Sequence, residues 1–342
     1  MDPSPAKVAL DQINGVTRTA STAAAGARRQ YRRHIRGVTE VTMRPATMDV
    51  DGLELHYAVS SNDSGDHEQL WAINIHGYFA GGEMYHRESE RLAESLGWRV
   101  VNPSLPGFGG SQPLSWGQIS MPSLARRIEA VMDQLDIDRA IILGHSMGGG
   151  VAVEFAARHP ERTLGVVYRA GVATPAWHHR RGLLPLAMSA VAPDVAPIAD
   201  LVAAVAFDVP DLFVGRMLST IRSVLPDLRR NLKTLARTAP VASMLMEVEQ
   251  TAQVVSFRRA GVPVLAEWGC FDRIVTAATA QEFSQVADTE VLWVPGGHSW
   301  MLARPTGQRD ILRHLPIGRS FLDDVVNRQA STGGQLHLRA VG

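Results

Sequence analysis

Cysteine is almost missing from this sequence, and so are several features that would assign other protein classes. The single cysteine, Cys270, excludes a disulfide within one chain, which is compatible with a reducing compartment, so a cytoplasmic location is expected. Thirty-four Lys and Arg balance 34 Asp and Glu, so no excess positive charge indicates a nucleic-acid partner. The first 45 residues hold no apolar segment of the length that a secretory signal needs.

Motifs for metals and nucleotides are also missing. There is no H-E-x-x-H, no paired cysteines and no P-loop, and residues 107–110 depart from G-x-G-x-x-G. We therefore expect neither a metal nor a cofactor. The composition, 45% hydrophobic and 20% charged, suits one large globular domain or one domain with an insertion.

Two segments raise the question of a membrane. The apolar run 183–207 is long enough for a span, but it contains three prolines and two central carboxylates, Asp194 and Asp200, which would be costly there. A pair of lid helices is the favoured interpretation. Five arginines between residues 28 and 36 form either a membrane-surface or partner-binding arm or, as we favour, a solvated helix or flexible leader.

Strand and helix patterns alternate along most of the chain. Residues 48–60 alternate in hydrophobicity around Asp51-Gly52, which predicts a hairpin. Further strands are predicted at 70–77, at the start of 98–111, and at 139–144, 163–171, 262–272 and 289–298, with helices at 81–97, 121–137, 149–160, 276–287 and 306–315. Such alternation predicts a mostly parallel sheet of the eight-stranded type, with helices on both faces.

The alternation stops between Thr174 and Arg259, where the pattern is helical and no strand is convincing. This segment is predicted to be an insertion across the top of the sheet. The expected organisation is a flexible basic leader over 1–46, a core over 47–173 and 260–327, a helical cap over 174–259 and a flexible tail over 328–342.

One serine stands between glycines where an apolar strand ends. In "GHSMG", Gly144 and Gly148 flank Ser146, between the strand predicted at 139–144 and the helix predicted at 149–160. G-x-S-x-G in this strand–turn–helix setting is typical of a nucleophile elbow, which holds the serine hydroxyl away from its own backbone. Side chains at the two glycine positions would clash with neighbouring elements. The N–H of Met147 is then expected to point where an oxyanion forms.

A serine nucleophile needs a base, and the base needs an orienting carboxylate. Asp272 follows the strand predicted within 262–272, and His298 ends the last predicted strand, so both are expected at the same sheet edge as Ser146. Gly296 and Gly297 let the histidine loop pass close to the serine. Glu267, the rival acid, lies inside its strand and reaches less easily.

The second oxyanion donor is expected in "HGYFAGG", directly after the strand at 70–77. Tyr78 supplies the expected N–H, with Phe79 as the alternative. His76 is expected to brace this loop by hydrogen bonds. Phe79 and His145 are also expected to contact substrate.

The motifs "HGYF", "LPGFGGS", "GHSMGGG", "WGCFD" and "GGH" occur in the order found in α/β-hydrolases, and the chain resembles that family, in its branch with a helical cap, over residues 48–315. The serine elbow is similar to those of monoacylglycerol lipases, bacterial esterases, cofactor-free haloperoxidases and carbon–carbon bond hydrolases. Relatives that are dehalogenases or epoxide hydrolases carry Asp at the nucleophile position, so Ser146 argues against both. "HGYFAGG" departs from the Gly-Pro-Gly type of loop usual in carbon–carbon hydrolases.

The resemblance implies a carboxylic ester hydrolase that works through an acyl-enzyme. A carbon–carbon bond hydrolase, a cofactor-free perhydrolase and an acyltransferase remain open on the same triad, as does a non-enzymatic ligand receptor or scaffold of the same fold.

The apolar composition of the cap bears on the substrate. Four methionines, at 188, 217, 244 and 246, add flexible surface that suits irregular apolar ligands, although most apolar cap residues are expected to form the cap's own core. A small, lipid-like ester is therefore the expected partner. Peripheral membrane contact through the cap or the basic leader is part of the same expectation.

Overall fold

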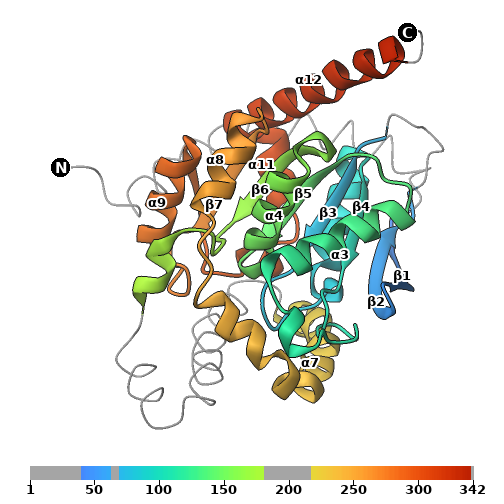
Figure 1. Cartoon of the computed structure of the whole chain (residues 1–342), viewed down its shortest axis with the longest axis vertical. Coiled ribbons are helices and arrows are strands. Elements are labelled where there is room, and N and C mark those ends of the chain that lie inside the picture. Colours follow the sequence, from blue (N-terminus) through green and yellow to red (C-terminus); the bar gives the residue numbers. More distant parts are fainter. Residues whose placement is uncertain (1–39, 63–68, 181–216, 340–342) are drawn as a thin grey trace.

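The computed structural model describes residues 40–62, 69–180 and 217–339. Its centre is one eight-stranded sheet in the order β1-β2-β4-β3-β5-β6-β7-β8 (Figure 1). The strands are β1 (Met43–Val50), β2 (Leu53–Ser60), β3 (Trp71–Ile75), β4 (Arg99–Pro103), β5 (Ala140–His145), β6 (Thr163–Arg169), β7 (Val264–Gly269) and β8 (Val291–Val294). Strand β2 pairs antiparallel with both of its neighbours, and all pairs from β4 to β8 are parallel. The predicted fold class is confirmed.

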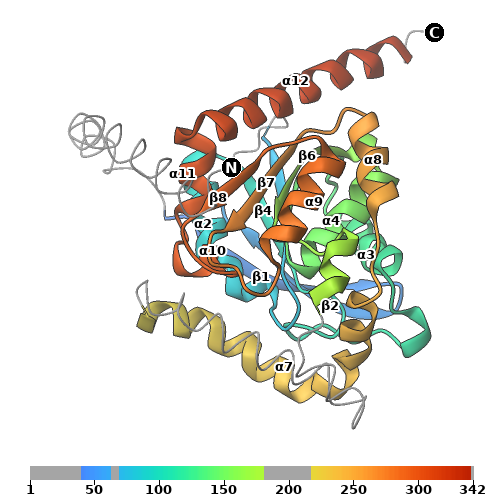
Figure 2. The ribbon, with the colours of Figure 1, turned by 90° about the vertical axis from the view of Figure 1, so that its left-hand side faces the viewer.

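Helices cover both faces of the sheet. Figure 2 shows α2 (His86–Leu96), α11 (Gly307–His314) and α12 (Pro316–Arg339) on one side, and α3 (Met121–Gln134), α4 (Met147–Arg158), α8 (Thr251–Arg259) and α9 (Ala277–Ala287) on the other. Each side has its own hydrophobic core against the sheet. The short helices are η1 (Gly82–Tyr85), η2 (Trp116–Gln118), η3 (Pro160–Arg162), η4 (Pro175–Arg180) and α10 (Trp300–Ala303).

The predicted hairpin turns at Asp51-Gly52, as expected. Both residues have positive φ, 52° and 76°, which is the conformation of a two-residue turn that matches the twist of paired strands. The first strand, however, begins at Met43, which pairs with Ser60. The leader boundary at residue 46 was therefore too late. The reason is that β1 is an edge strand with a largely exposed middle, so its apolar pattern is weak.

The boundary of the insertion also differs from the prediction. Within its described part, residues 174–180 and 217–259, there is no strand, and the long helix α7 (Met217–Leu245) runs below the sheet (Figure 2). The final helix, α8, packs instead against α4 and α9, and its Val254 and Phe257 are buried in the main core. A crossover helix is needed between the parallel strands β6 and β7, so α8 belongs to the core rather than to the cap.

Two predicted segments lie outside the described residues: the arginine cluster of the leader, and the apolar run 183–207 with Met188. No helix in the part of the chain that the structure describes is long and apolar enough to cross a membrane.

The tail predicted from residue 328 lies, as far as Arg339, within helix α12. Arg328 donates hydrogen bonds to the carbonyl oxygens of four residues near the ends of β6 and α8, namely Pro160, Thr163, Ala260 and Gly261. A side chain held at four carbonyls ties this helix to the core, an arrangement that the composition of the tail does not reveal.

Candidate active site

Ser146 lies at a sharp turn between β5 and α4. Its φ of 54° and ψ of −118° are rare for a residue with a side chain, and such backbone strain costs about 1–3 kcal/mol. The turn is held because the Ser146 N–H donates to the Arg169 carbonyl at 3.0 Å and the Ser146 carbonyl accepts from the Gly149 N–H at 2.9 Å. The predicted order of strand, turn and helix is found here, although β5 ends one residue later and α4 begins two residues earlier than predicted.

The flanking glycines allow this turn by close approach. A Cβ at Gly144 would lie 2.3 Å from the Gly148 carbonyl oxygen, and a Cβ at Gly148 would lie 2.3 Å from the Ile75 carbonyl oxygen. Both distances are well inside van der Waals contact with backbone atoms that have little room to move. The clash expected at these two positions is confirmed.

Asp272 and His298 are brought together at the ends of β7 and β8. His298 Nδ1 donates to Asp272 Oδ2 at 2.8 Å, and both side chains are almost fully buried. Asp272 Oδ1 accepts from the N–H groups of Ile274 and Val275 at 2.8 and 2.9 Å, so both carboxylate oxygens have partners. The carboxylate is therefore fixed in the orientation that presents Oδ2 to the histidine.

The two loops that carry these residues are themselves joined. The Phe271 N–H donates to the Gly296 carbonyl at 3.0 Å. Gly269 packs so closely on the histidine loop that a Cβ there would lie 2.1 Å from the Gly297 carbonyl oxygen. Gly296 has a φ of 144°, a region that residues with side chains rarely adopt. The glycine pair thus lets the histidine loop pass close to the end of β7, whereas its predicted close passage to the serine stays a prediction.

His145 connects this loop to the serine turn. The His298 carbonyl can only accept, so His145 Nε2 donates to it at 3.0 Å, and His145 Nδ1 accepts from the Tyr85 hydroxyl at 2.6 Å. The rings of His145 and His298 lie 4.6 Å apart. Burial, and then the nearby His298, hold the pKa of His145 well below its ordinary value. Both nitrogens of His145 are therefore engaged inside the protein, and its contact with substrate stays a prediction.

The loop after β3 passes against the serine. A Cβ at Gly77 would lie 3.2 Å from Ser146 Cβ. The Gly77 N–H donates to the Tyr85 hydroxyl at 3.4 Å, and the Ala80 N–H donates to the Gly77 carbonyl at 3.2 Å. The N–H groups of Tyr78 and Phe79 make no hydrogen bond to the described residues. They are therefore the candidate donors of this loop, and their oxyanion role stays a prediction.

His76 braces this loop, as expected. Its Nδ1 donates to the Gly77 carbonyl at 2.7 Å, and its Nε2 accepts from the Leu105 N–H at 2.9 Å. Complete burial lowers the pKa of His76 to about 4, so the ring is neutral at physiological pH. A neutral ring with both nitrogens occupied serves as a strut and has no role left as a base.

Glu267, the rival acid, lies apart from this chemistry. Its Oε1 accepts from Gln308 at 2.7 Å, and burial raises the pKa of its carboxyl to about 8. A protonated, buried carboxyl bonded to an amide does not orient His298. Among the described residues, no cluster of three or more His, Cys, Asp or Glu is arranged to hold a metal ion.

Sequence reasoning missed two groups of supporting residues. Tyr85 was placed in a predicted helix, yet its hydroxyl links Gly77 to His145. Asp227 and Asn231 of α7 bond to the loop and helix that follow β3. Their spacing of four residues places Asp227 and Asn231 on one helix face. Nothing in the sequence identifies their partners, which lie 143 or more residues away in the chain.

Comparisons with known proteins agree with this architecture. A family model described as the alpha/beta hydrolase fold matches residues 73–305. The chain is 31% identical over 243 residues to the "Putative non-heme haloperoxidase" of Mycobacterium phage D29, covering 70% of this chain and 85% of that protein. It is 32% identical over 126 residues to a 2-hydroxy-6-oxo-6-phenylhexa-2,4-dienoate hydrolase of Burkholderia cepacia, covering 37% of this chain and 44% of that enzyme.

Among solved structures, the chain resembles a thermophilic esterase from Thermogutta terrifontis. The TM-score is 0.58 at 19% identity, and the match covers 84% of this chain and 99% of that one. At this level of identity the likeness concerns the fold.

Proposed function

Because the chain belongs to the alpha/beta hydrolase fold family, we propose that it is a serine hydrolase that cleaves carboxylic esters through an acyl-enzyme, with Ser146, His298 and Asp272 as its catalytic triad. The observation that carries the proposal is the 2.8 Å hydrogen bond from His298 to the Asp272 carboxylate, which two backbone amides fix in place. The loop that carries His298 is bonded in turn to His145, the residue before the serine. An oriented base beside an elbow serine is the arrangement that activates a hydroxyl.

The proposed reaction begins with attack of Ser146 Oγ on the ester carbonyl carbon. His298 donates through Nδ1 to Asp272, so Nε2 is the nitrogen that takes the serine proton. The imidazolium, stabilised by Asp272, then gives this proton to the leaving alcohol. Water, deprotonated by His298, attacks the acyl-enzyme and releases the acid and the free serine.

Backbone donors would hold the oxyanion of both tetrahedral intermediates. Met147 is the first residue of α4, where an N–H has no acceptor within its own helix. The loop after β3 supplies the second donor, Tyr78 in the first instance and Phe79 as the alternative. An oxyanion donor of this kind is worth about 10²–10³ in kcat.

The test is Ser146→Ala, with Ser320→Ala, an exposed position on α12, as the matched control. We expect Ser146→Ala to lower hydrolysis of a p-nitrophenyl ester by about 10⁴-fold or more, since triad losses are that large, and Ser320→Ala to match the wild type. A fluorophosphonate probe should label the wild-type protein at Ser146. Undiminished turnover in Ser146→Ala, or failure of the intact protein to label, would refute the assignment; the latter would favour a ligand receptor of the same fold.

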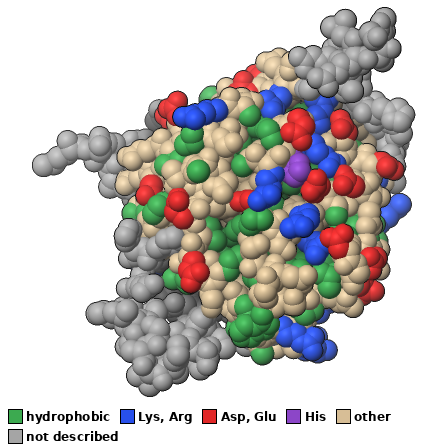
Figure 3. All heavy atoms as spheres, viewed as in Figure 1, with side chains coloured by type: hydrophobic (Ala, Val, Ile, Leu, Met, Phe, Trp, Pro, Cys, Tyr) green, Lys and Arg blue, Asp and Glu red, His purple; other side chains and the backbone are tan. Residues whose placement is uncertain are grey.

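A lipophilic acyl group is the proposed substrate feature. Three exposed large hydrophobic residues are candidates for contact with such a group. Trp116 lies in η2 after β4, Leu232 lies on α7, and Phe271 lies after β7, directly before Asp272. Figure 3 shows hydrophobic side chains scattered over one face, including its lower part, where α7 lies in Figure 1. Burial of each methylene is worth about 0.8 kcal/mol, so p-nitrophenyl octanoate should exceed acetate in kcat/KM. A ratio of one or less, below the micelle concentration, contradicts the preference.

Peripheral membrane contact belongs to the same proposal. The outer face of α7 carries exposed Arg229, Lys233 and Arg237 next to exposed Leu232, a combination that suits an anionic lipid surface. Cosedimentation should therefore be stronger with vesicles that contain phosphatidylserine than with pure phosphatidylcholine. Equal recovery with both, or with neither, would remove this part of the proposal.

Carbon–carbon bond hydrolysis is the second candidate, favoured by the 32% identity to the dienoate hydrolase of Burkholderia cepacia. The assay is loss of the absorbance of 2-hydroxy-6-oxo-6-phenylhexa-2,4-dienoate. A higher kcat/KM on this compound than on every ester would replace the first proposal. The likeness to the phage protein justifies two parallel measurements, peracid formation from acetate and peroxide and acyl transfer to added alcohols.

A further inference from the structure

Helix α7 presents a row of polar side chains to the core, although it belongs to the insertion. Asp227, Asn231, Thr234 and Thr238 follow one another at intervals of four, three and four residues, which places them on one helix face. Asp227, Asn231 and Thr238 are almost completely buried. Polar groups are costly to bury without hydrogen-bond partners. The partners of these side chains therefore identify the segments of the core that this helix face holds in place.

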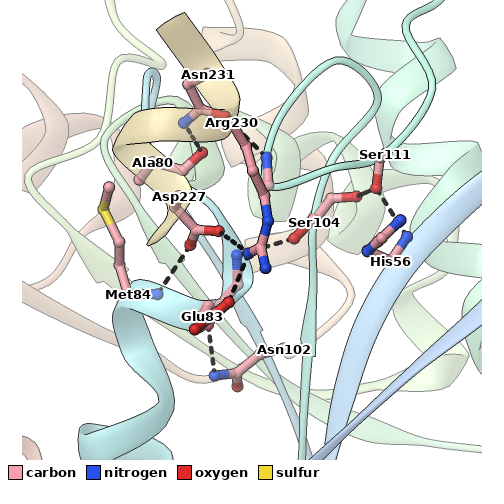
Figure 4. A network of polar contacts seen from close by, with 12 residues as sticks. His56, Ala80, Glu83, Met84, Asn102, Ser104, Ser111, Asp227, Arg230 and Asn231 are labelled. Carbon is pink, nitrogen blue, oxygen red and sulfur yellow. Dashed lines mark hydrogen bonds and ion pairs between the residues drawn. The ribbon is translucent and has the colours of Figure 1, made fainter. Parts of the chain in front are cut away.

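Asn231 binds the oxyanion loop, the segment 77–80 that offers the oxyanion donors. Its Nδ2 donates to the carbonyl oxygens of Phe79 at 2.8 Å and Ala80 at 3.0 Å, and its Oδ1 accepts from the Gly109 N–H at 2.9 Å (Figure 4). Both amide hydrogens and the carbonyl of this side chain are therefore engaged. A single residue of α7 thus joins the loop after β3 to the loop after β4.

Asp227 fixes the helix that follows the same loop. Its Oδ2 accepts from the Met84 N–H at 3.0 Å, and its Oδ1 accepts from the Arg230 guanidinium at 3.1 Å (Figure 4). The same guanidinium donates to the Glu83 carboxylate at 2.5 Å. A Cβ at Gly81 would lie 2.6 Å from the Asp227 carboxyl, so the carboxyl occupies the space left by that glycine. The chain is thus held by α7 at the oxyanion loop and again at Met84.

These contacts determine a strained backbone. Phe79 has a φ of 61°, which costs about 1–3 kcal/mol for a residue with a side chain and persists only where the surroundings enforce it. The peptide between Phe79 and Ala80 is held at both ends, its oxygen by Asn231 and its N–H by the Gly77 carbonyl. The positive φ then sets the direction of the preceding peptide, which carries the Phe79 N–H, and that of the Tyr78 residue next to it.

We propose that Asn231 is a positioning residue for catalysis: by binding the Phe79 and Ala80 carbonyls it holds the oxyanion loop in its working conformation, so that α7 completes the active site as well as covering it. The proposal rests on the proposed function, since it assigns the oxyanion donors to this loop. Asn231 touches no reacting atom. Its effect is on the direction of backbone N–H groups, so it should act on the transition state and leave ground-state binding of the ester almost unchanged.

The decisive variant is Asn231→Asp, which keeps the size of the side chain and the acceptor for Gly109 but removes both donors. We expect kcat to fall about 10- to 100-fold, because small displacements of catalytic groups have effects of this size, with KM within about threefold of the wild-type value. Inhibition by a trifluoromethyl ketone, whose serine adduct places an oxyanion in the hole, should weaken by the same factor as kcat/KM.

Two further variants control for loosening of the helix. Ala236→Ser, at another exposed position of α7, should match the wild type. Thr234→Val removes the 2.9 Å hydrogen bond from α7 to the Gly107 carbonyl without touching the oxyanion loop, and it should lower kcat less than about threefold. Amide hydrogen exchange of the peptide that spans residues 78–80 should accelerate in Asn231→Asp and stay unchanged in Ala236→Ser.

The outcomes separate the two proposals. A rise in KM with kcat unchanged, an accelerated loop with undiminished kcat, or an equal loss of kcat in Thr234→Val each overturns the role of Asn231 and leaves the triad assignment intact. Ester hydrolysis that persists in Ser146→Ala overturns the proposed function, and the role of Asn231 with it.

Discussion

Replacing Asp272 by Asn should abolish most of the activity while changing the shape of the site very little. In the native structure Oδ1 accepts two backbone N–H groups and Oδ2 accepts from His298. An amide NH₂ in the Oδ1 position would face the two N–H donors, so the introduced amide has to turn its oxygen toward the backbone. Its NH₂ group then faces His298 Nδ1, which is forced to accept and to carry its proton on Nε2.

This tautomer lacks the acceptor that the serine proton needs. The same change in a serine protease triad, a worked case in protein chemistry, lowers kcat about 10⁴-fold, and we expect a loss of that order here. KM should move little, because Asp272 is buried behind the histidine.

The assay is steady-state hydrolysis of a p-nitrophenyl ester by purified Asp272→Asn, with Glu290→Gln, which changes an exposed carboxylate just before β8, as control. Thermal unfolding of both variants is measured as well, to test whether each is folded. A kcat within tenfold of the wild type in a folded Asp272→Asn protein would refute the view that this carboxylate sets the tautomer of His298.

Two other predictions concern stability. Burial raises the pKa of Glu267 from 4.5 to about 8, so from pH 5 to 8 the folded protein retains a proton that the unfolded chain releases, and stability falls as pH rises by up to about 1.4 kcal/mol per unit. Glu267→Gln should remove this slope; parallel stability profiles of variant and wild type in urea would contradict it. Gly148→Ala places a Cβ 2.3 Å from the Ile75 carbonyl and should cost about 3 kcal/mol and most activity, whereas Gly117→Ala, with open space around it, should be neutral by the same unfolding measurement.

The triad candidates were accessible from the sequence because each lies within four residues after the end of a strand. Parallel strands end at a common sheet edge, so residues placed just after β5, β7 and β8 are neighbours in space however far apart they lie in the chain. The order serine, acid, base and the paired glycines before His298 reduced the choice further. The Asp272–His298 hydrogen bond agrees with that reasoning, and the catalytic roles themselves stay predictions.

His145 shows where such reasoning ends. Its position next to Ser146 suggested contact with substrate, but its partners are the Tyr85 hydroxyl and the His298 carbonyl. His145 is the last residue of β5, and its side chain is buried in the protein. Which groups await it there depends on the segment that leads into α2 and on the loop after β8, and the local sequence says nothing of either.

The sequence by itself determined the hairpin at Asp51-Gly52, the alternation of strands and helices, and the serine turn with its glycines, because these follow from backbone sterics and side-chain periodicity within a few residues. Tertiary structure alone decided that α8 belongs to the core, that Glu267 is buried and bonded to Gln308, and that Asn231 of α7 holds the carbonyl of Phe79. Each of these three features depends on a contact between residues at least 41 positions apart in the chain, or on the packing of a whole helix. The local sequence would form the same helix or strand with quite different neighbours, so it does not determine those contacts.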